Sequence, residues 1–221
     1  MNIDLKKRIL TSLILFSLLT AMYYYSFILI IALIIISMIV WVEFYTLISK
    51  ILIRNSFKDK LYSFLFKLIS LIYLSLLVLF LISIEYNYSH LKIFVLYSIL
   101  VAILSDIGGL AFGKFFKGKK LTKISPNKTI SGSIGSFIFS TILVVIFDDK
   151  FIEFNFLTLI TVTILISLTS QLGDLFISYL KRRAKVKDTS DILPGHGGFL
   201  DRVDGIIFAI PAGVLLFNFF I

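Results

Sequence analysis

Long apolar runs separated by short charged segments repeat along the whole chain of 221 residues. A helix needs about 20 apolar residues to cross a hydrocarbon core of about 30 Å. Runs of suitable length lie near 9–25, 27–48, 62–84, 91–113, 131–147, 156–179 and 205–221. The pattern predicts an all-α fold, a polytopic integral membrane helix bundle of about seven transmembrane helices with short loops. Pro211 should kink the last helix.

The composition agrees with a membrane protein, since 58% of the residues are hydrophobic. The chain has no cysteine, which excludes disulfides and thiolate chemistry. Its basic and then apolar N-terminus is similar to a signal peptide, but no small-residue cleavage site follows, so we expect a membrane anchor. No internal repeat or low-complexity linker is visible. We therefore expect a single transmembrane domain over residues 1–221.

The basic residues predict the orientation of the chain, because short cytoplasmic loops are rich in Lys and Arg. With the N-terminus inside, all of the 22 Lys and Arg residues except Lys92 and Lys150 fall on the cytoplasmic side. Both long loops, 114–130 and 180–204, are then cytoplasmic. We expect a multi-pass protein of the cell (inner or plasma) membrane. Its net charge of +9 is explained by topology and contact with anionic lipid, without a nucleic acid partner.

One acidic residue lies inside the fourth apolar run. Asp106 would cost at least about 2.5 kcal/mol at membrane depth, so we expect it to face the bundle interior. Gly109 and Gly113 follow it at helical spacing and give that face small residues. Two interpretations stay open: a helix contact through the glycines with Asp106 hydrogen-bonded to a neighbour, or a metal or substrate site.

A polar stripe follows one side of the sixth apolar run. Its members recur at steps of three and four and are Thr163, Ser167, Ser170, Gln171, Asp174 and Ser178. Ser and Thr alone are typical of interhelical contacts, whereas the added carboxylate favours a wet or metal-holding groove that opens to the cytoplasm.

The 180–204 segment is the most polar part of the chain. Its carboxylates are Asp188, Asp191, Asp201 and Asp204, and its cations are Lys181, Arg182, Arg183, Lys185, Lys187 and Arg202. Carboxylates and cations at this density, without thiols, are typical of a magnesium–polyphosphate site. Gly195, Gly197 and Gly198 would let the backbone bend or approach a phosphate. At the start of a helix, Asp201 and Asp204 would point the same way.

His196 in this segment has three open interpretations: a general base, a hydrogen-bond donor to phosphate, or a residue that only forms hydrogen bonds within the loop. Zinc is not expected, because no second histidine lies nearby and His90 falls on the other side of the membrane in this topology.

The segment from Ser178 to Asp204 resembles the signature of the CDP-diglyceride synthetases, also called phosphatidate cytidylyltransferases. The matching residues, all at the signature spacing, are Ser178, Leu180, Lys181, Arg182, Lys187, Asp188, Ser190, Pro194, His196, Gly197, Gly198, Asp201, Arg202 and Asp204. A second block, 105–136, resembles the family's acidic and glycine-containing stretch, its basic SPxKT loop and the helix start that follows. This block departs from the pattern at Ser131, where an acidic residue is common, and at Ser136, where glycine is usual.

The resemblance implies transfer of the cytidylyl group from CTP to phosphatidic acid, with Mg²⁺ as cofactor; a second cation and a homodimer are left open. It divides the domain into N-terminal helices 1–90 and catalytic helices 91–221. The residues expected to act in catalysis are Asp201, Asp204, Arg202, Lys187, Asp188 and His196. Those expected to bind substrate are Lys181, Arg182, Ser178, Ser125, Lys128, Thr129, Gly197 and Gly198. The expected metal ligands are Asp201, Asp204, Asp174 and Asp106.

Two other functions use similar residues. A CTP-dependent lipid kinase of the polyprenol or phytol type would need the same metal and cations. A non-enzymatic transporter would also use intramembrane carboxylates, but it would not explain the closely spaced Asp, Arg and Gly residues of the 180–204 segment.

Overall fold

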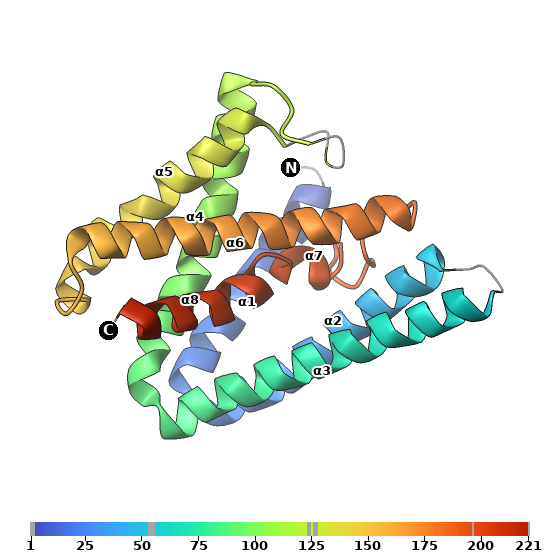
Figure 1. Cartoon of the computed structure of the whole chain (residues 1–221), viewed down its shortest axis with the longest axis horizontal. Helices are drawn as coiled ribbons and strands as arrows, with labels where there is room; N and C mark the ends of the chain where they lie inside the picture. The colour runs from blue at the N-terminus through green and yellow to red at the C-terminus, as the bar shows by residue number, and fades with distance from the viewer. Residues whose placement is uncertain (1–2, 53–55, 123–124, 126–127, 196, 221) are drawn as a thin grey trace. The chain divides into compact units, whose positions relative to one another are not determined.

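The computed structural model describes residues 3–52, 56–122, 125, 128–195 and 197–220, and the regular structure within these ranges is helical (Figure 1). The α-helices are α1 (Ile3–Tyr24), α2 (Ser26–Ile51), α3 (Phe57–Asn87), α4 (Lys92–Phe116), α5 (Ile130–Phe147), α6 (Phe156–Arg183), α7 (Leu200–Val203) and α8 (Ile206–Phe220). Short 3-10 turns occur at Ser89–Leu91 and Asp148–Lys150.

The helices confirm the expected multi-pass membrane architecture. Among the described residues, six segments are long and apolar enough to cross a bilayer, and they contain α2, α3, α4, α5, α6 and α8. In α1 the apolar stretch Leu13–Tyr24 is shorter. Many large apolar side chains on these helices are exposed, among them Phe64, Leu76 and Val145, as expected for surfaces that face lipid. Pro211 lies inside α8, and a kink there stays a prediction.

The helix ends follow local backbone preferences. Tyr25 separates α1 from α2 because it adopts an extended conformation at the start of α2. Lys117 takes a left-handed conformation (φ 44°) that ends α4. Thr129 caps α5, since its side-chain oxygen accepts a hydrogen bond from the Gly132 amide at 3.0 Å. The polar loop between α4 and α5 therefore begins at Lys117 and ends at Thr129.

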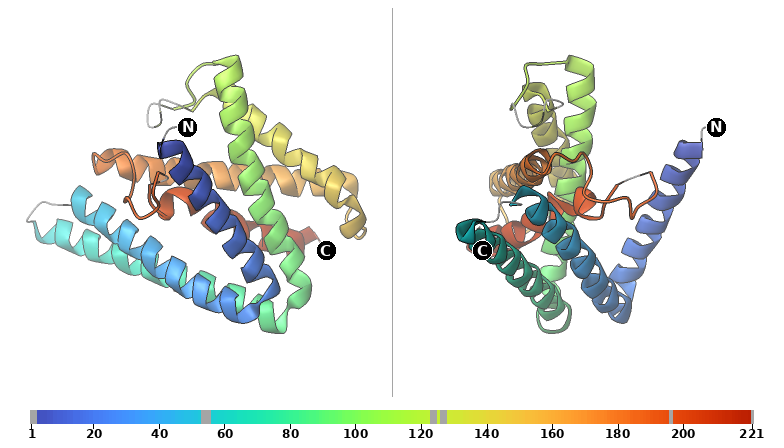
Figure 2. Two further views of the ribbon diagram at one scale, coloured as in Figure 1. Left: turned by 180° about the vertical axis from the view of Figure 1, so that it is seen from behind. Right: turned by 90° about the vertical axis from the view of Figure 1, so that its right-hand side faces the viewer.

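The chain groups into two compact units. The first unit comprises Met1–Asn87 and Leu180–Arg202, and the second comprises Tyr88–Tyr179 and Val203–Ile221. In the first unit, α2 and α3 pack along each other, as both views of Figure 2 show. Trp41 Nε1 donates to the Lys67 carbonyl (3.2 Å), and Ser26 donates to Glu85. Residues 180–202 group with the N-terminal helices in this division, and the expected separation into N-terminal helices 1–90 and catalytic helices 91–221 stays a prediction.

The second unit is built on the close approach of α4 and α5 through small residues. A methyl group at Gly108 would lie 2.4 Å from the Gly135 carbonyl oxygen, and one at Gly109 would lie 2.8 Å from Ser136 Oγ. α8 packs on α4, where Gly213 makes room for Ser98. The glycine face that the sequence predicts after Asp106 is therefore an interhelical contact.

The expectation that Asp106 faces the bundle interior is wrong, because its side chain is exposed. The buried face of α4 contains Ser98, Val101, Ser105 and Gly108, which recur at helical spacing. Asp106 follows Ser105 by one residue and so points away from the centre of this face. Its role as a metal ligand stays a prediction.

The polar stripe of α6 is divided. Thr163, Ser167 and Ser170 are completely buried, so the expected wet groove does not extend along this half of the helix. Thr163 shares a hydrogen bond with Tyr97 (2.6 Å), and Ser167 shares one with Ser105 (2.9 Å). These residues join α6 to α4, and only the part of the stripe from Gln171 onward is available for a site.

Candidate functional site

The loop that follows α6, residues 184–199, has no helical structure in its described part, 184–195 and 197–199. α6 ends where Lys185 adopts a left-handed conformation (φ 57°) and the Val186 amide donates back to the Lys181 carbonyl (3.0 Å). Farther along, the Leu193 amide donates to the Gly197 carbonyl (2.9 Å) and closes a tight turn. The 184–199 loop is polar, so its conformation depends on side chains that satisfy its backbone groups.

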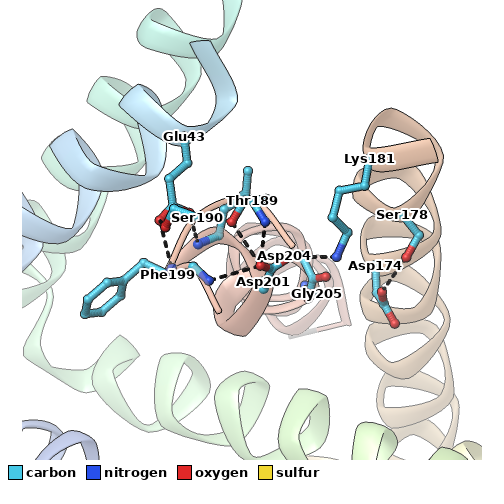
Figure 3. Close-up of polar contacts among 12 residues, drawn as sticks. Glu43, Asp174, Ser178, Lys181, Thr189, Ser190, Phe199, Asp201, Asp204 and Gly205 are labelled. Atoms are coloured by element: carbon cyan, nitrogen blue, oxygen red, sulfur yellow. Dashed lines mark hydrogen bonds and ion pairs between the residues drawn. The ribbon is translucent and has the colours of Figure 1, made fainter. Parts of the chain in front are cut away.

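Glu43 of α2 is the first of two carboxylates that hold this loop (Figure 3). Its Oε1 accepts hydrogen bonds from Ser190 Oγ (2.5 Å) and the Phe199 amide (3.1 Å). Its Oε2 accepts from Thr189 Oγ1 (2.8 Å) and the Leu200 amide (2.7 Å). Glu43 is only 2% exposed, so the middle of the loop and its C-terminal end are tied to one buried carboxylate.

Asp201 in α7 is the second carboxylate. Its Oδ1 lies 2.6 Å from Lys181 Nζ, and its Oδ2 accepts from the amides of Thr189 (2.8 Å) and Gly198 (3.1 Å). The Asp201 side chain is 5% exposed. Thr189 Oγ1 also lies 3.0 Å from Asp201 Oδ2, and its single proton can serve either Glu43 or Asp201 at one time. The hydroxyl therefore links the two carboxylates.

Two glycines of the loop are explained by these contacts. Gly197 has a φ of 82°, where a side chain is disfavoured, and a methyl group there would lie 3.1 Å from Asp201 Oδ2. A methyl group at Gly198 would lie 1.9 Å from Thr189 Oγ1 and 2.6 Å from Glu43 Oε2. The pair serves close approach of the backbone to the two carboxylates.

Four of the other charged residues predicted in this region are exposed. Arg182, Lys187, Asp188 and Arg202 are exposed, unlike the sheltered Lys181–Asp201 pair. Cations that reach solvent from an ordered backbone are suited to binding a polyphosphate. His196 lies outside the described residues.

In the second unit, Asp174 on α6 forms a smaller polar cluster. Its Oδ1 accepts from Ser178 Oγ (3.2 Å), and its Oδ2 pairs with Lys128 Nζ. The side chains of Lys128 and Asp174 are 26% and 24% exposed. This carboxylate is partly open to solvent, and its contacts among the described residues are with side chains.

The loop that carries Lys128 is pinned by backbone bonds. The Leu121 amide donates to the Lys128 carbonyl (2.8 Å), and the Lys128 amide donates to the Ser125 carbonyl (3.1 Å). Both departures from the family pattern make contacts here. Ser131 Oγ accepts from the Gly118 amide (3.2 Å), and buried Ser136 donates to the Ser105 carbonyl (2.7 Å).

Asp204 lies apart from the helix that carries Asp201. α7 ends at Val203, so Asp204 lies in the turn before α8 and the helical-spacing argument for a shared direction does not apply. Asp204 is 6% exposed, and its Oδ1 accepts from the Gly205 amide (2.9 Å). In the same unit, Gly205 lies against Ser170.

Magnesium binds through one or two carboxylates together with phosphate oxygens and water. Within the described part of the chain, no three Asp, Glu or His residues converge on one point. Both oxygens of Asp201 already accept hydrogen bonds, whereas Asp174 is more accessible and lies beside a lysine. The carboxylates thus fit magnesium if substrate phosphates complete its coordination, and the metal assignment stays a prediction.

The sequence interpretation missed Glu43 and Thr189. A signal for Glu43 was present, since it is an acidic residue within the apolar run 27–48, and the cost argument used for Asp106 applies to it equally. No sequence pattern marked Thr189 as the residue that links two carboxylates.

Comparisons with known proteins agree with the signature. The model of a family described as the cytidylyltransferase family matches residues 3–220. The chain is 47% identical over 121 residues to a phosphatidate cytidylyltransferase of Staphylococcus haemolyticus, covering 53% of this chain and 46% of that protein. It is 39% identical over 170 residues to one of Staphylococcus saprophyticus, covering 76% and 62%. The chain thus spans about half the length of the first of these relatives.

Proposed function

We propose that this chain, which belongs to the cytidylyltransferase family, transfers the cytidylyl group from CTP to phosphatidic acid and gives CDP-diacylglycerol and pyrophosphate. The observation that carries the proposal is that the loop bearing the family signature is held in one conformation by hydrogen bonds. Its backbone is fixed by Glu43 and Asp201, while Arg182, Lys187 and Arg202 remain exposed for phosphate binding.

The exposed cations fit the charge of a nucleoside triphosphate. Nucleotidyl transfer requires stabilisation of negative charge at the α-phosphate while pyrophosphate leaves. Arginine and lysine side chains on an ordered loop can supply part of this stabilisation without reorganisation. We assign Arg182, Lys187 and Arg202 to the CTP phosphates. Lys181 instead positions Asp201, since the two form a sheltered ion pair.

Asp174 would hold magnesium, which would supply neutralisation of phosphate charge. Lys128 pairs with Asp174 and can exchange this partner for a lipid phosphate. Ser125 and Thr129 lie in the same loop, where Thr129 also caps α5. A lipid phosphate is anionic at neutral pH, so its attack requires no strong general base, and the reaction does not depend on His196 in that role.

The basic residues support an orientation in which the 114–130 and 180–204 loops face the cytoplasm. CTP would then reach the site from the cytosol, and phosphatidic acid would reach it from the bilayer. Reaction at this boundary explains why the most polar loops belong to such an apolar chain.

The test uses the purified full chain in detergent with Mg²⁺ and, in separate reactions, phosphatidic acid or a polyprenol as the lipid acceptor. CTP is supplied either with label in the cytosine ring or with label in the γ-phosphate. We expect ring label in the lipid and γ label in released pyrophosphate. Transfer of γ label into lipid would indicate a lipid kinase instead, and the absence of both products would contradict the proposed activity.

A further inference from the structure

We propose that Glu43 is a positioning residue for the reaction: it fixes the 184–199 loop and the start of α7, and through them the orientation of Asp201 and Arg202. The proposal deepens the proposed function and rests on it where the reaction is concerned. Glu43 lies in α2, 146 residues before Thr189 and 157 residues before Leu200, so the contact joins distant parts of the chain within the first unit.

The surroundings of Glu43 indicate a specific use of its charge. A buried carboxylate in an apolar helix is costly, and a leucine or methionine would pack at the same place without that cost. All four donors to Glu43 are uncharged, namely two hydroxyl groups and two backbone amides. Each carboxylate oxygen receives two of them, which is the full capacity of the group. The hydrogen-bonding capacity of the Glu43 carboxylate is therefore filled by these four donors.

The two amides identify what Glu43 orders. Leu200 is the first residue of α7, and Phe199 precedes it, so their N–H groups lack partners within the helix. Glu43 satisfies both of them and thereby defines where α7 begins. Asp201 and Arg202 are the next two residues, so their directions follow from this helix start.

The hydroxyl donors extend the same control to the middle of the loop. Thr189 and Ser190 bind Glu43 directly, and the Thr189 amide binds Asp201. Glu43 therefore holds the middle of the loop and its C-terminal end against one carboxylate. Asp201 holds a different pair of amides, those of Thr189 and Gly198, which lets the two carboxylates be distinguished by experiment.

The first experiment is amide hydrogen exchange at single-residue resolution on the full chain in detergent. In Glu43→Gln, one oxygen becomes an NH₂ group that faces donors, so we expect fast exchange at Phe199 or Leu200 or both. Protection at Gly198, which depends on Asp201, should be retained. Unchanged protection at Phe199 and Leu200 would overturn the proposal, and so would uniform loss of protection throughout α2.

The second experiment measures the kinetics of the same variant. We expect kcat/KM for CTP to fall about tenfold or more, because one hydrogen bond to a charged group is typically worth that factor. KM for phosphatidic acid should stay unchanged. Glu85→Gln is the matched control, since it makes the same substitution in the same unit at a carboxylate that receives a hydrogen bond from Ser26. Its kinetics should match those of the unmodified chain.

Two results separate positioning from general stability. Glu43→Asp, which keeps the charge, should recover part of the lost activity. A fall in activity that only follows the unfolded fraction of Glu43→Gln would overturn the proposal. If the unmodified chain forms no CDP-diacylglycerol, the proposed function is wrong, whereas the exchange experiment still decides whether Glu43 orders the loop.

Discussion

The carboxylates of Asp201, inside the family signature, and of Asp174, four residues before its start at Ser178, are held in different ways. Asp201 is 5% exposed and accepts hydrogen bonds from two backbone amides as well as from Lys181. Asp174 is 24% exposed and contacts only side chains, those of Ser178 and Lys128, among the contacts of the described residues. A bond to the backbone fixes a loop, whereas a bond to a mobile side chain can be exchanged for a ligand.

This difference indicates separate tasks for two aspartates that the sequence analysis expects to be metal ligands. We expect Asp201 to order the loop, and Asp174 is the better candidate to bind an incoming group. Substitutions can test the division, because they should change folding stability at one position and activity alone at the other. The expected effects on the free energy of unfolding decrease in the following order.

The largest effect is expected for Asp201→Asn. Removing one partner of a sheltered ion pair costs about 3 kcal/mol or more, because Lys181 keeps a charge without its partner. Denaturant unfolding in detergent measures this loss, and cytidylyl transfer should become undetectable. Asp191→Asn is the control, since Asp191 is exposed in the same loop. Equal stability of the two variants would contradict the structural role of Asp201.

A smaller loss is expected for Gly198→Ala. The added methyl group would lie 1.9 Å from Thr189 Oγ1, and this overpacking should cost about 1–3 kcal/mol. The unfolding free energy of the double variant with Thr189→Ala provides the check. Because Thr189→Ala removes the clashing hydroxyl, the combined loss should be less than the sum of the single losses. Strict additivity would mean that the two residues are not in contact.

Thr189→Val tests the link between the carboxylates. Valine has the shape of threonine without the hydroxyl, so we expect a loss of about 1 kcal/mol from the missing hydrogen bond. Thr189→Ser keeps the hydroxyl and should remain closer to the unmodified chain. Thermal unfolding and kcat are measured for both variants. Equal values for the valine and serine variants would contradict a role for the Thr189 hydroxyl.

The smallest change in stability is expected for Asp174→Asn, below about 1 kcal/mol, because its ion pair is partly exposed to solvent. Activity should nevertheless fall about a hundredfold or more if the carboxylate acts at the reacting phosphates. Magnesium titration of the activity is the useful measurement, since the variant should require more metal. Loss of stability comparable with Asp201→Asn would remove the distinction between the two aspartates.

The sequence was sufficient for the membrane helices, since hydropathy alone selects runs such as 27–48 and 156–179. It did not define which way each helix faces. Asp106 is exposed rather than interior because the packed face of α4 is set by Ser105 and Gly108. Such a rotation depends on which helix packs where, and a linear pattern does not contain that information.

The site shows the same limit. The signature assigned Lys181 to substrate binding and Asp201 to metal binding, and the structure pairs the two side chains with each other. The acceptors for the loop backbone could not be found in the signature, because Glu43 lies more than a hundred residues away along the chain. A close study of polar residues within apolar runs would have found Glu43, though not its partners.

The separation between Glu43 and its partners has a consequence for biogenesis. During synthesis at about 5–20 residues per second, Glu43 is made about 7–30 seconds before Thr189 and Leu200 exist. Over that interval, the membrane insertion machinery must accept a helix whose carboxylate has none of these four donors. Nascent chains that end before residue 189 should therefore hold α2 less firmly in the bilayer than complete chains, and they should be the preferred targets of membrane quality control.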